Sequence, residues 1–186
     1  AELMKGRQGE DLTFDDTREP LNAGVTFTGL QGHIWSETIR TDERVEYMLF
    51  PRIIALAERA WNKASWELEY DYAGRIYSAD SHFFTDAHKQ QRDREWSRFS
   101  SNLAVKYLPK LDRAGINYRI PTPGAILNKG KLEMNSIFPG MPLDYRLNRG
   151  QWTPWHSAVE VSAEDHIDVR GRSADGKRKG RSWSIN

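Results

Sequence analysis

Apolar residues recur at helical spacing in two stretches of the chain. Between residues 42 and 61 they follow steps of three and four, and Thr41 followed by two acidic residues is typical of a helix N-terminus. Pro51 lies inside this pattern and predicts a kink, because proline has no amide hydrogen to donate. The face that we expect to be buried consists of Val45, Met48, Leu49, Ile53, Leu56 and Ala60.

The second predicted helix runs from about residue 86 to residue 113, and Gly115 is placed to end it. Its apolar positions keep the same helical spacing, at Trp96, Phe99, Leu103, Tyr107 and Leu111. Ahead of the first helix, β-forming residues from Val25 to Glu37 predict a short buried strand. The polar residues 1–24 predict a loop.

The hydrophobic pattern changes after Gly115 from a period of 3.6 to a period of two. Residues 118–124 contain two prolines and predict a stiff, extended segment. Short alternating runs follow, at Leu132 and Met134, Leu143 to Leu147, Val159 and Val161, Ile167 and Val169, and Trp183 and Ile185. Turn residues separate these runs, which predicts a small β-sandwich. We therefore expect a boundary near residue 116, with one domain of residues 1–116 and another of residues 117–186.

The composition narrows the class of protein. The 186 residues are 38% hydrophobic and 28% charged, which fits one ordinary globular domain or two small ones. The net charge of +1 gives no bias toward nucleic acid or an anionic membrane, and no apolar run is long enough for a membrane span. The lack of cysteine excludes disulfides, thiolate catalysis and Cys-based zinc sites. Because the chain begins at Ala1 without a signal-like stretch, we expect a trimmed or internal piece of a longer protein.

Aromatic and basic clusters are the remaining candidates for binding. Trp66, Tyr70, Tyr72 and Tyr77 are expected to pack over the helix ends, with an extended sugar-binding surface as the alternative. Trp152 and Trp155 could form a carbohydrate platform, but packing of the sandwich is the favoured interpretation. The basic run of Lys177, Arg178, Lys179 and Arg181 predicts an exposed hairpin tip, with anion binding as the alternative.

Short segments in a consistent order resemble family 20 glycoside hydrolases. They include Trp35-Ser36-Glu37, Arg40-Thr41-Asp42, Glu46-Tyr47-Met48, Phe50-Pro51-Arg52 and Ala57-Glu58-Arg59-Ala60-Trp61. Further segments are similar to the bacterial chitobiases of that family, at Lys110-Leu111-Asp112, Tyr118-Arg119-Ile120-Pro121, Pro123-Gly124-Ala125 and residues 173–178. The resemblance covers the chain from about residue 24 to its end.

The resemblance implies an α+β fold in two parts. The last strand and helices of a (β/α)8 barrel would be followed by a small immunoglobulin-like β-sandwich. The implied activity is release of terminal N-acetylglucosamine from chitobiose and related chito-oligosaccharides, without a metal or organic cofactor. In that family an adjacent Asp-Glu pair works with the substrate's own acetamido oxygen. This chain has no such pair in a matching context, since Asp42-Glu43 opens a helix and Asp93 and Glu95 lie within one. The chain is therefore expected to contribute no catalytic residue and to be inactive alone.

Two residues match substrate-binding positions of the family. Trp35 would form a wall of the pocket for the terminal sugar, with a core tryptophan as the alternative. Glu37 would accept hydrogen bonds from the O4 and O6 hydroxyls, with a helix-capping carboxylate as the alternative. His33 is expected to pack rather than to bind a ligand. Structural ion pairs are the expected role of Arg52, Glu58 and Arg59.

The expected partners follow from the same resemblance. They are a chito-oligosaccharide substrate of the longer enzyme and the rest of its catalytic barrel, with a periplasmic or extracellular location. We expect no nucleic acid partner, and the wide apolar helix face predicts self-association of the chain alone. The alternative function is a non-catalytic β-sandwich that binds carbohydrate or protein. An exposed aromatic row on one sheet face would favour that alternative.

Overall fold

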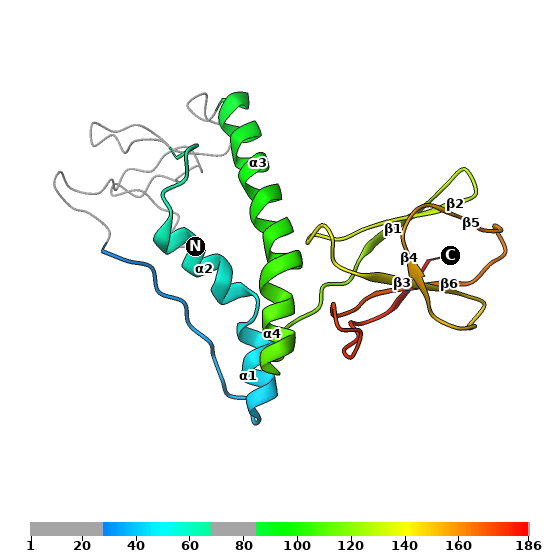
Figure 1. Cartoon of the computed structure of the whole chain (residues 1–186), viewed down its shortest axis with the longest axis horizontal. Helices are drawn as coiled ribbons and strands as arrows, with labels where there is room; N and C mark the ends of the chain where they lie inside the picture. The colour runs from blue at the N-terminus through cyan, green and yellow to red at the C-terminus, as the bar shows by residue number, and fades with distance from the viewer. Residues whose placement is uncertain (1–27, 68–84, 186) are drawn as a thin grey trace, which may run out of the picture. The chain divides into compact units, whose positions relative to one another are not determined.

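The computed structural model describes residues 28–67 and 85–185, which form a mixed helix and sheet structure (Figure 1). The predicted loop at residues 1–24 lies outside the described residues, as do Tyr70, Tyr72 and Tyr77. Residues 32–56 belong with residues 96–185 to one compact unit, and the other described residues belong to a second. Trp66, in the second unit, is half-buried.

The first predicted helix is divided into α1 (Asp42–Leu49) and α2 (Arg52–Trp61). Thr41 is the N-cap, as predicted, and its hydroxyl accepts a hydrogen bond from the Arg44 amide over 3.4 Å. Phe50 has extended backbone angles of φ −93° and ψ 139°, because the residue before a proline avoids the helical region. The predicted kink at Pro51 is therefore a complete break between two helices.

The apolar face of these helices is largely exposed in the part of the chain that the structure describes, which agrees with the self-association expected of the chain alone. No residue of α1 or α2 is buried, and Val45, Met48 and Ile53 are each more than a third exposed. Their helical spacing is the pattern of a face meant for burial, but no described element covers it. Only the break packs inward, since Pro51 is buried and Phe50 and Ile54 contact a hydrophobic cluster.

The predicted strand at residues 25–37 is also wrong for its described part, since residues 28–37 contain no strand. A strand exists only when its backbone groups pair with those of a neighbour, and no described strand lies beside this segment. The segment ends instead in a turn, closed by a 3.0 Å hydrogen bond from the Ile39 amide to the Ser36 carbonyl.

The second predicted helix is confirmed. It comprises α3 (Asp86–Asn102), a π-helical stretch η2 (Leu103–Tyr107) and α4 (Leu108–Ala114) without a break. Gly115 ends it with a left-handed φ of 71°, and its amide donates to carbonyls of the last turn. Leu103 of the predicted apolar face is buried, whereas Trp96 and Tyr107 are exposed.

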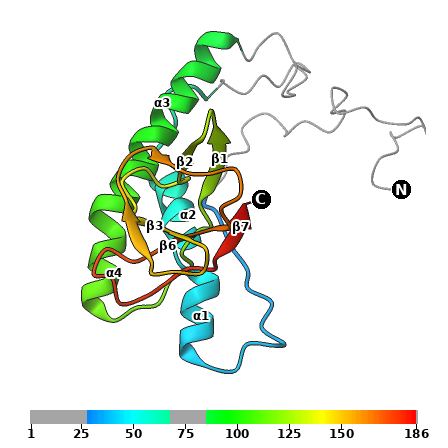
Figure 2. The same cartoon turned by 90° about the vertical axis from the view of Figure 1, so that its right-hand side faces the viewer.

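Within residues 28–67 and 85–185, seven antiparallel strands form two sheets (Figures 1 and 2). The first has the order β1 (Gly124–Asn128), β2 (Lys131–Asn135), β5 (Val159–Glu160). The second has the order β4 (Thr153–Trp155), β3 (Leu143–Leu147), β6 (Ile167–Gly171), β7 (Trp183–Ile185). Four of the five predicted alternating runs lie entirely in strands. In the fifth, Val159 belongs to β5, whereas Val161 follows the last residue of that strand, Glu160.

The alternating pattern missed β1 and β4, both at sheet edges. β1 is exposed along nearly all its length and so has no apolar alternation to detect. β4 contains Pro154, which cannot donate to a sheet ladder and is tolerated at an edge.

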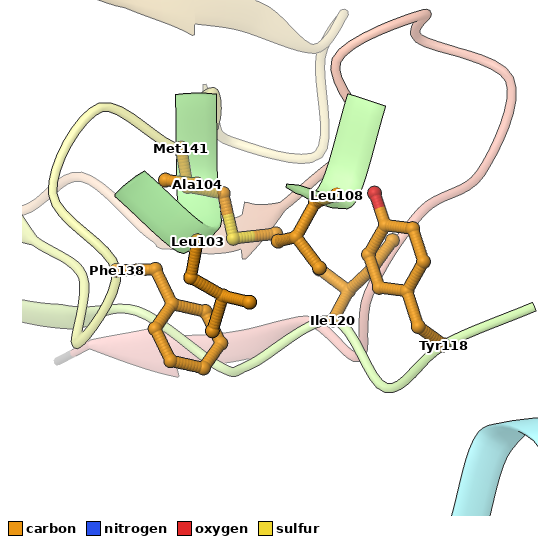
Figure 3. Packing of buried hydrophobic residues seen from close by; sticks show 7 residues of the cluster. All are labelled: Leu103, Ala104, Leu108, Tyr118, Ile120, Phe138 and Met141. Carbon is orange, nitrogen blue, oxygen red and sulfur yellow. The ribbon is translucent and has the colours of Figure 1, made fainter. Parts of the chain in front are cut away.

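Among the described residues, two hydrophobic clusters stabilise the compact unit of residues 32–56 and 96–185. The first lies between the two sheets and is built from Leu132, Met134, Leu143, Ile167 and Val169. The second joins the long helix to the extended segment before β1 and to the β2–β3 loop (Figure 3). Its buried members are Leu103, Ala104, Leu108, Tyr118, Ile120, Phe138 and Met141. The long helix therefore shares a core with residues on both sides of the β1–β2 hairpin, and that core crosses residue 116.

Charged side chains cover the opposite face of the four-stranded sheet. Asp144 of β3 stands directly opposite Arg170 of β6, and Arg146 stands opposite Asp168. The Arg146 Nε donates to the Asp168 carboxylate over 2.7 Å, and the Arg170 Nε donates to Asp144 over 3.3 Å. Burial alone would raise the pKa of Asp168, but hydrogen bonds from Ser184 and Arg146 outweigh it and hold that pKa below its usual value.

Candidate functional site

Both predicted substrate-binding residues lie in the exposed segment before α1. The Trp35 side chain is 80% exposed, and its indole stacks on the His33 ring with centroids 6.4 Å apart. Glu37 is the second residue of the turn from Ser36 to Ile39, so its carboxylate is also exposed. Trp35 is therefore not packed in a core of the described residues, and its role in a longer protein stays a prediction. The cap of α1 is Thr41 rather than Glu37.

This segment brings an aromatic ring and a carboxylate together on one short exposed stretch. A flat, exposed indole offers an apolar face to a pyranose ring, and a carboxylate two residues away offers two acceptor oxygens. Both belong to one short stretch, and the described residues supply no second wall. The arrangement therefore fits one side of a sugar pocket rather than a complete site.

Glu43 and Glu95, two further carboxylates considered in the sequence analysis, are not suited to act as a general acid. A general acid needs a raised pKa, yet a backbone hydrogen bond at Glu43 and the Thr41 hydroxyl hold the pKa of Glu43 below its usual value. The Ser65 hydroxyl, which donates to Glu95, lowers the pKa of that carboxyl in the same way. Both groups stay ionised and stabilise local structure. Among the described residues, no group of three His, Asp or Glu could hold a metal ion.

The predicted ion-pair residues make only weak or local contacts. Arg52 donates from Nη1 to the Met48 carbonyl over 2.7 Å. Arg59 and Glu58 are sequence neighbours whose exposed charges lie 3.9 Å apart. An exposed pair of this kind contributes roughly 0–1 kcal/mol to stability. A tie to neighbouring elements through these three residues stays a prediction.

Trp152 and Trp155 do not form a shared platform. Trp155 stands opposite Leu143 and packs on the core between the sheets, as the packing interpretation predicted. Its indole Nε1 is buried and has no hydrogen-bond partner among the described residues. Trp152 lies on the charged face instead, where the guanidinium carbons of Arg170 and Arg146 stand 3.9 and 4.7 Å from its ring centroid. The aromatic row expected of a carbohydrate-binding module is therefore absent at this pair.

The basic run is not simply an exposed hairpin tip, because Arg178 is turned inward. Its guanidinium pairs with the Asp112 carboxylate of α4 and donates to the Ile116 carbonyl over 2.9 Å. It also lies over the Tyr118 ring, 4.2 Å from the centroid. Lys177 before it and Lys179 and Arg181 after it are exposed. The sequence offered no signal for this difference, since Arg178 has cationic neighbours on both sides.

Comparison with known proteins divides the chain into two matched regions. The model of the glycosyl hydrolase family 20 catalytic domain matches residues 5–64. The model of the chitobiase/beta-hexosaminidase C-terminal domain matches residues 107–182. Trp35 and Glu37 fall in the first region, and the β-strands fall largely in the second.

Full-length relatives carry the same names. The chain is 40% identical over 185 residues to an N,N'-diacetylchitobiase of Vibrio harveyi, which covers the whole chain and 20% of that protein. It is 39% identical to a beta-hexosaminidase of Vibrio vulnificus, over 86% of the chain and 19% of the relative. It is 52% identical to beta-hexosaminidase B of Pseudoalteromonas piscicida, over 55% of the chain and 13% of the relative. The chain thus spans about a fifth, or less, of the length of these relatives.

Proposed function

We propose, from its membership of the chitobiase and β-hexosaminidase family, that this chain is the C-terminal portion of a β-N-acetylhexosaminidase. The longer enzyme would release terminal β-linked N-acetylglucosamine from chitobiose and chito-oligosaccharides. The observation that carries the proposal is the pair of consecutive family matches together with alignment over a fifth of the relatives' length. The site's local geometry is compatible with it, since the sugar-binding candidates share one exposed segment.

The fold supports the assignment of the two parts of the chain to two different domains of that enzyme. Residues up to about 116 would be the end of a (β/α)8 barrel, with residues 28–37 becoming its last strand once the preceding strands are present. The exposed apolar faces of α1 and α2 are what a barrel helix would present to missing neighbours. The two sheets around one core would be the immunoglobulin-like sandwich.

Trp35 and Glu37 would contribute to the pocket of the terminal sugar. The end of a barrel strand is the face where barrel enzymes bind substrate, and both residues stand at the end of the segment that would form that strand. Trp35 would stack on the sugar ring, and Glu37 would accept hydrogen bonds from two hydroxyls. The acid and the residue that orients the acetamido group would come from the rest of the polypeptide. The acetamido oxygen of the substrate would then act as the nucleophile.

The exposed apolar surface supports self-association of the chain alone. Trp61 is 90% exposed at the end of α2, and Trp35 is nearly as accessible. Large exposed apolar groups of this kind mark surfaces that need a partner, here the missing part of the barrel or a second copy. No described helix combines the length and apolar character needed to cross a membrane. A periplasmic or extracellular location remains part of the proposal.

The test is hydrolysis of an aryl β-N-acetylglucosaminide by three proteins and by a mixture of two of them. The chain alone should give no turnover above a mock purification from the same host. A longer polypeptide that ends with these residues should be active, and a version of it cut before residue 28 should be inactive. Adding the chain to that shortened version should restore part of the activity. Turnover by the chain alone, or full activity of the shortened version, would refute the proposal.

A further inference from the structure

A groove of about 870 Å³ lies beside the second hydrophobic cluster. Its walls come from the break between α1 and α2, the segment 117–122, the β2–β3 loop and the connection between β6 and β7. Every residue that lines it belongs to the compact unit of residues 32–56 and 96–185.

The groove is strongly basic. Its lining contains Arg52, Arg119, Arg178, Lys179 and Arg181 and no carboxylate side chain. Asp112 already neutralises Arg178, and the nearby Glu46 carboxylate accepts a 2.6 Å hydrogen bond from the Asn117 amide. In the part of the chain that the structure describes, the other four cations have no carboxylate partner within 4 Å. Since the whole chain carries only +1, these cations represent a local separation of charge.

Backbone contacts fix the walls of the groove. The Arg119 amide donates to the Phe50 carbonyl over 3.1 Å, which ties the segment 117–122 to the end of α1. A Cβ added at Gly180 would lie 2.8 Å from the Ile120 side chain, so only glycine allows this close approach. Gly180 thereby brings Lys179 and Arg181 to the same segment from the other side. The backbone positions that carry the cations are fixed before any ligand arrives, which reduces the backbone entropy lost on binding.

We propose that this groove binds the anionic groups of an acidic polysaccharide. Guanidinium groups pair with carboxylate or sulfate through two parallel hydrogen bonds, and unpaired arginines from separate elements suit successive anionic groups along a chain. A single-stranded nucleic acid would need exposed aromatic faces for its bases. Of the aromatic rings in the groove lining, Tyr118 and Phe138 are buried, so Tyr47, with Arg119 5.8 Å from its centroid, is the one exposed ring and offers no row for successive bases.

The test measures binding of the 186-residue chain to three polysaccharides at low salt. Dextran sulfate supplies sulfates, polygalacturonate supplies carboxylates, and unmodified dextran is the neutral control. At least one acidic polymer should bind and dextran should not, and comparison of the two acidic polymers identifies the preferred anion. Arg119→Gln combined with Arg181→Gln should weaken binding about tenfold or more. It should also make the dependence of log affinity on log salt shallower by about two counterions.

The matched control changes two exposed arginines outside the groove, Arg98→Gln with Arg113→Gln. It removes the same charge and should keep the affinity within about twofold of the parent chain. Equal weakening by both double variants would overturn the proposal, as would tighter binding of an oligonucleotide of equal charge. The longer polypeptide should bind as well. If the longer polypeptide does not bind, the groove is covered by another part of that polypeptide, and the proposal is overturned.

Discussion

Arg178 pairs with Asp112 although 66 residues separate them in the chain. The Asp112 side chain is only 4% exposed, and the guanidinium above it is 28% exposed. The same guanidinium covers the Tyr118 ring and donates to the backbone just after α4. One side chain thus fixes the connection between β6 and β7 to the end of the long helix.

Arg178→Leu should lower the free energy of unfolding by about 3 kcal/mol, because it leaves the Asp112 carboxylate buried without a counter-charge. Urea denaturation of both proteins measures the change. Arg113→Leu is the control, since Arg113 is an exposed neighbour of Asp112 with no ion pair among the described residues. Equal midpoints for Arg178→Leu and the parent chain would show that the pair contributes nothing.

Tyr118 should make the fold sensitive to alkali. Burial, and next the Asp112 charge, raise the pKa of the Tyr118 phenol well above its usual value. The unfolded chain releases this proton near pH 10, whereas the folded chain retains it. Stability from this residue is therefore present below about pH 10 and falls as the pH rises further.

Unfolding midpoints between pH 8 and pH 11 test this dependence on pH. Tyr118→Phe should flatten the alkaline fall, because the phenylalanine ring has no proton to lose. Tyr107→Phe, at an exposed tyrosine, is the control and should leave the fall unchanged. A parallel decline for Tyr118→Phe and the parent chain would remove Tyr118 as the cause.

A fragment of residues 96–186 should be more stable than one of residues 117–186. The shorter fragment lacks Leu103 and Leu108 and so exposes Tyr118 and Phe138 of the second cluster. Losing one buried leucine typically costs about 2–5 kcal/mol, and here two are lost. Amide NMR dispersion and thermal midpoints compare the two. Equal midpoints would show that the sandwich is independent of the helix.

Glu37→Gln in the longer enzyme should lower kcat/KM for the aryl substrate about 10- to 100-fold. The loss corresponds to a hydrogen bond to a charged group, roughly 1.5–3 kcal/mol. Trp35→Ala should cost more, because it removes a wall and admits water. Glu43→Gln, at an exposed position in α1, is the control. Parent-like kcat/KM for Glu37→Gln, at an unchanged melting temperature, would exclude Glu37 from the sugar site.

The hydrophobic pattern correctly predicted the strands whose apolar side chains pack on a core that this chain itself supplies. Leu132, Leu143 and Ile167 alternate with polar residues and pack on one core, so period and structure agree. The pattern failed at residues 28–37, because a strand needs partners that no local periodicity supplies. The placement of Trp35 and Glu37 in a sugar pocket stays a prediction, since the local segment would form only one side of such a pocket. The inward turn of Arg178 depends on a partner 66 residues away and has no local signature.

The charged face of the four-stranded sheet has a consequence for how β3 and β6 align. A shift by two residues would keep every apolar side chain on the core face, so the alternation of apolar and polar residues does not oppose it. Such a shift in one direction would place Asp144 against Asp168, and in the other direction Arg146 against Arg170. Both misaligned forms set like charges face to face, which is destabilising. The charge pairs on the outer face of the sheet therefore oppose the two-residue shifts of β3 against β6 that the alternation of apolar and polar residues leaves open.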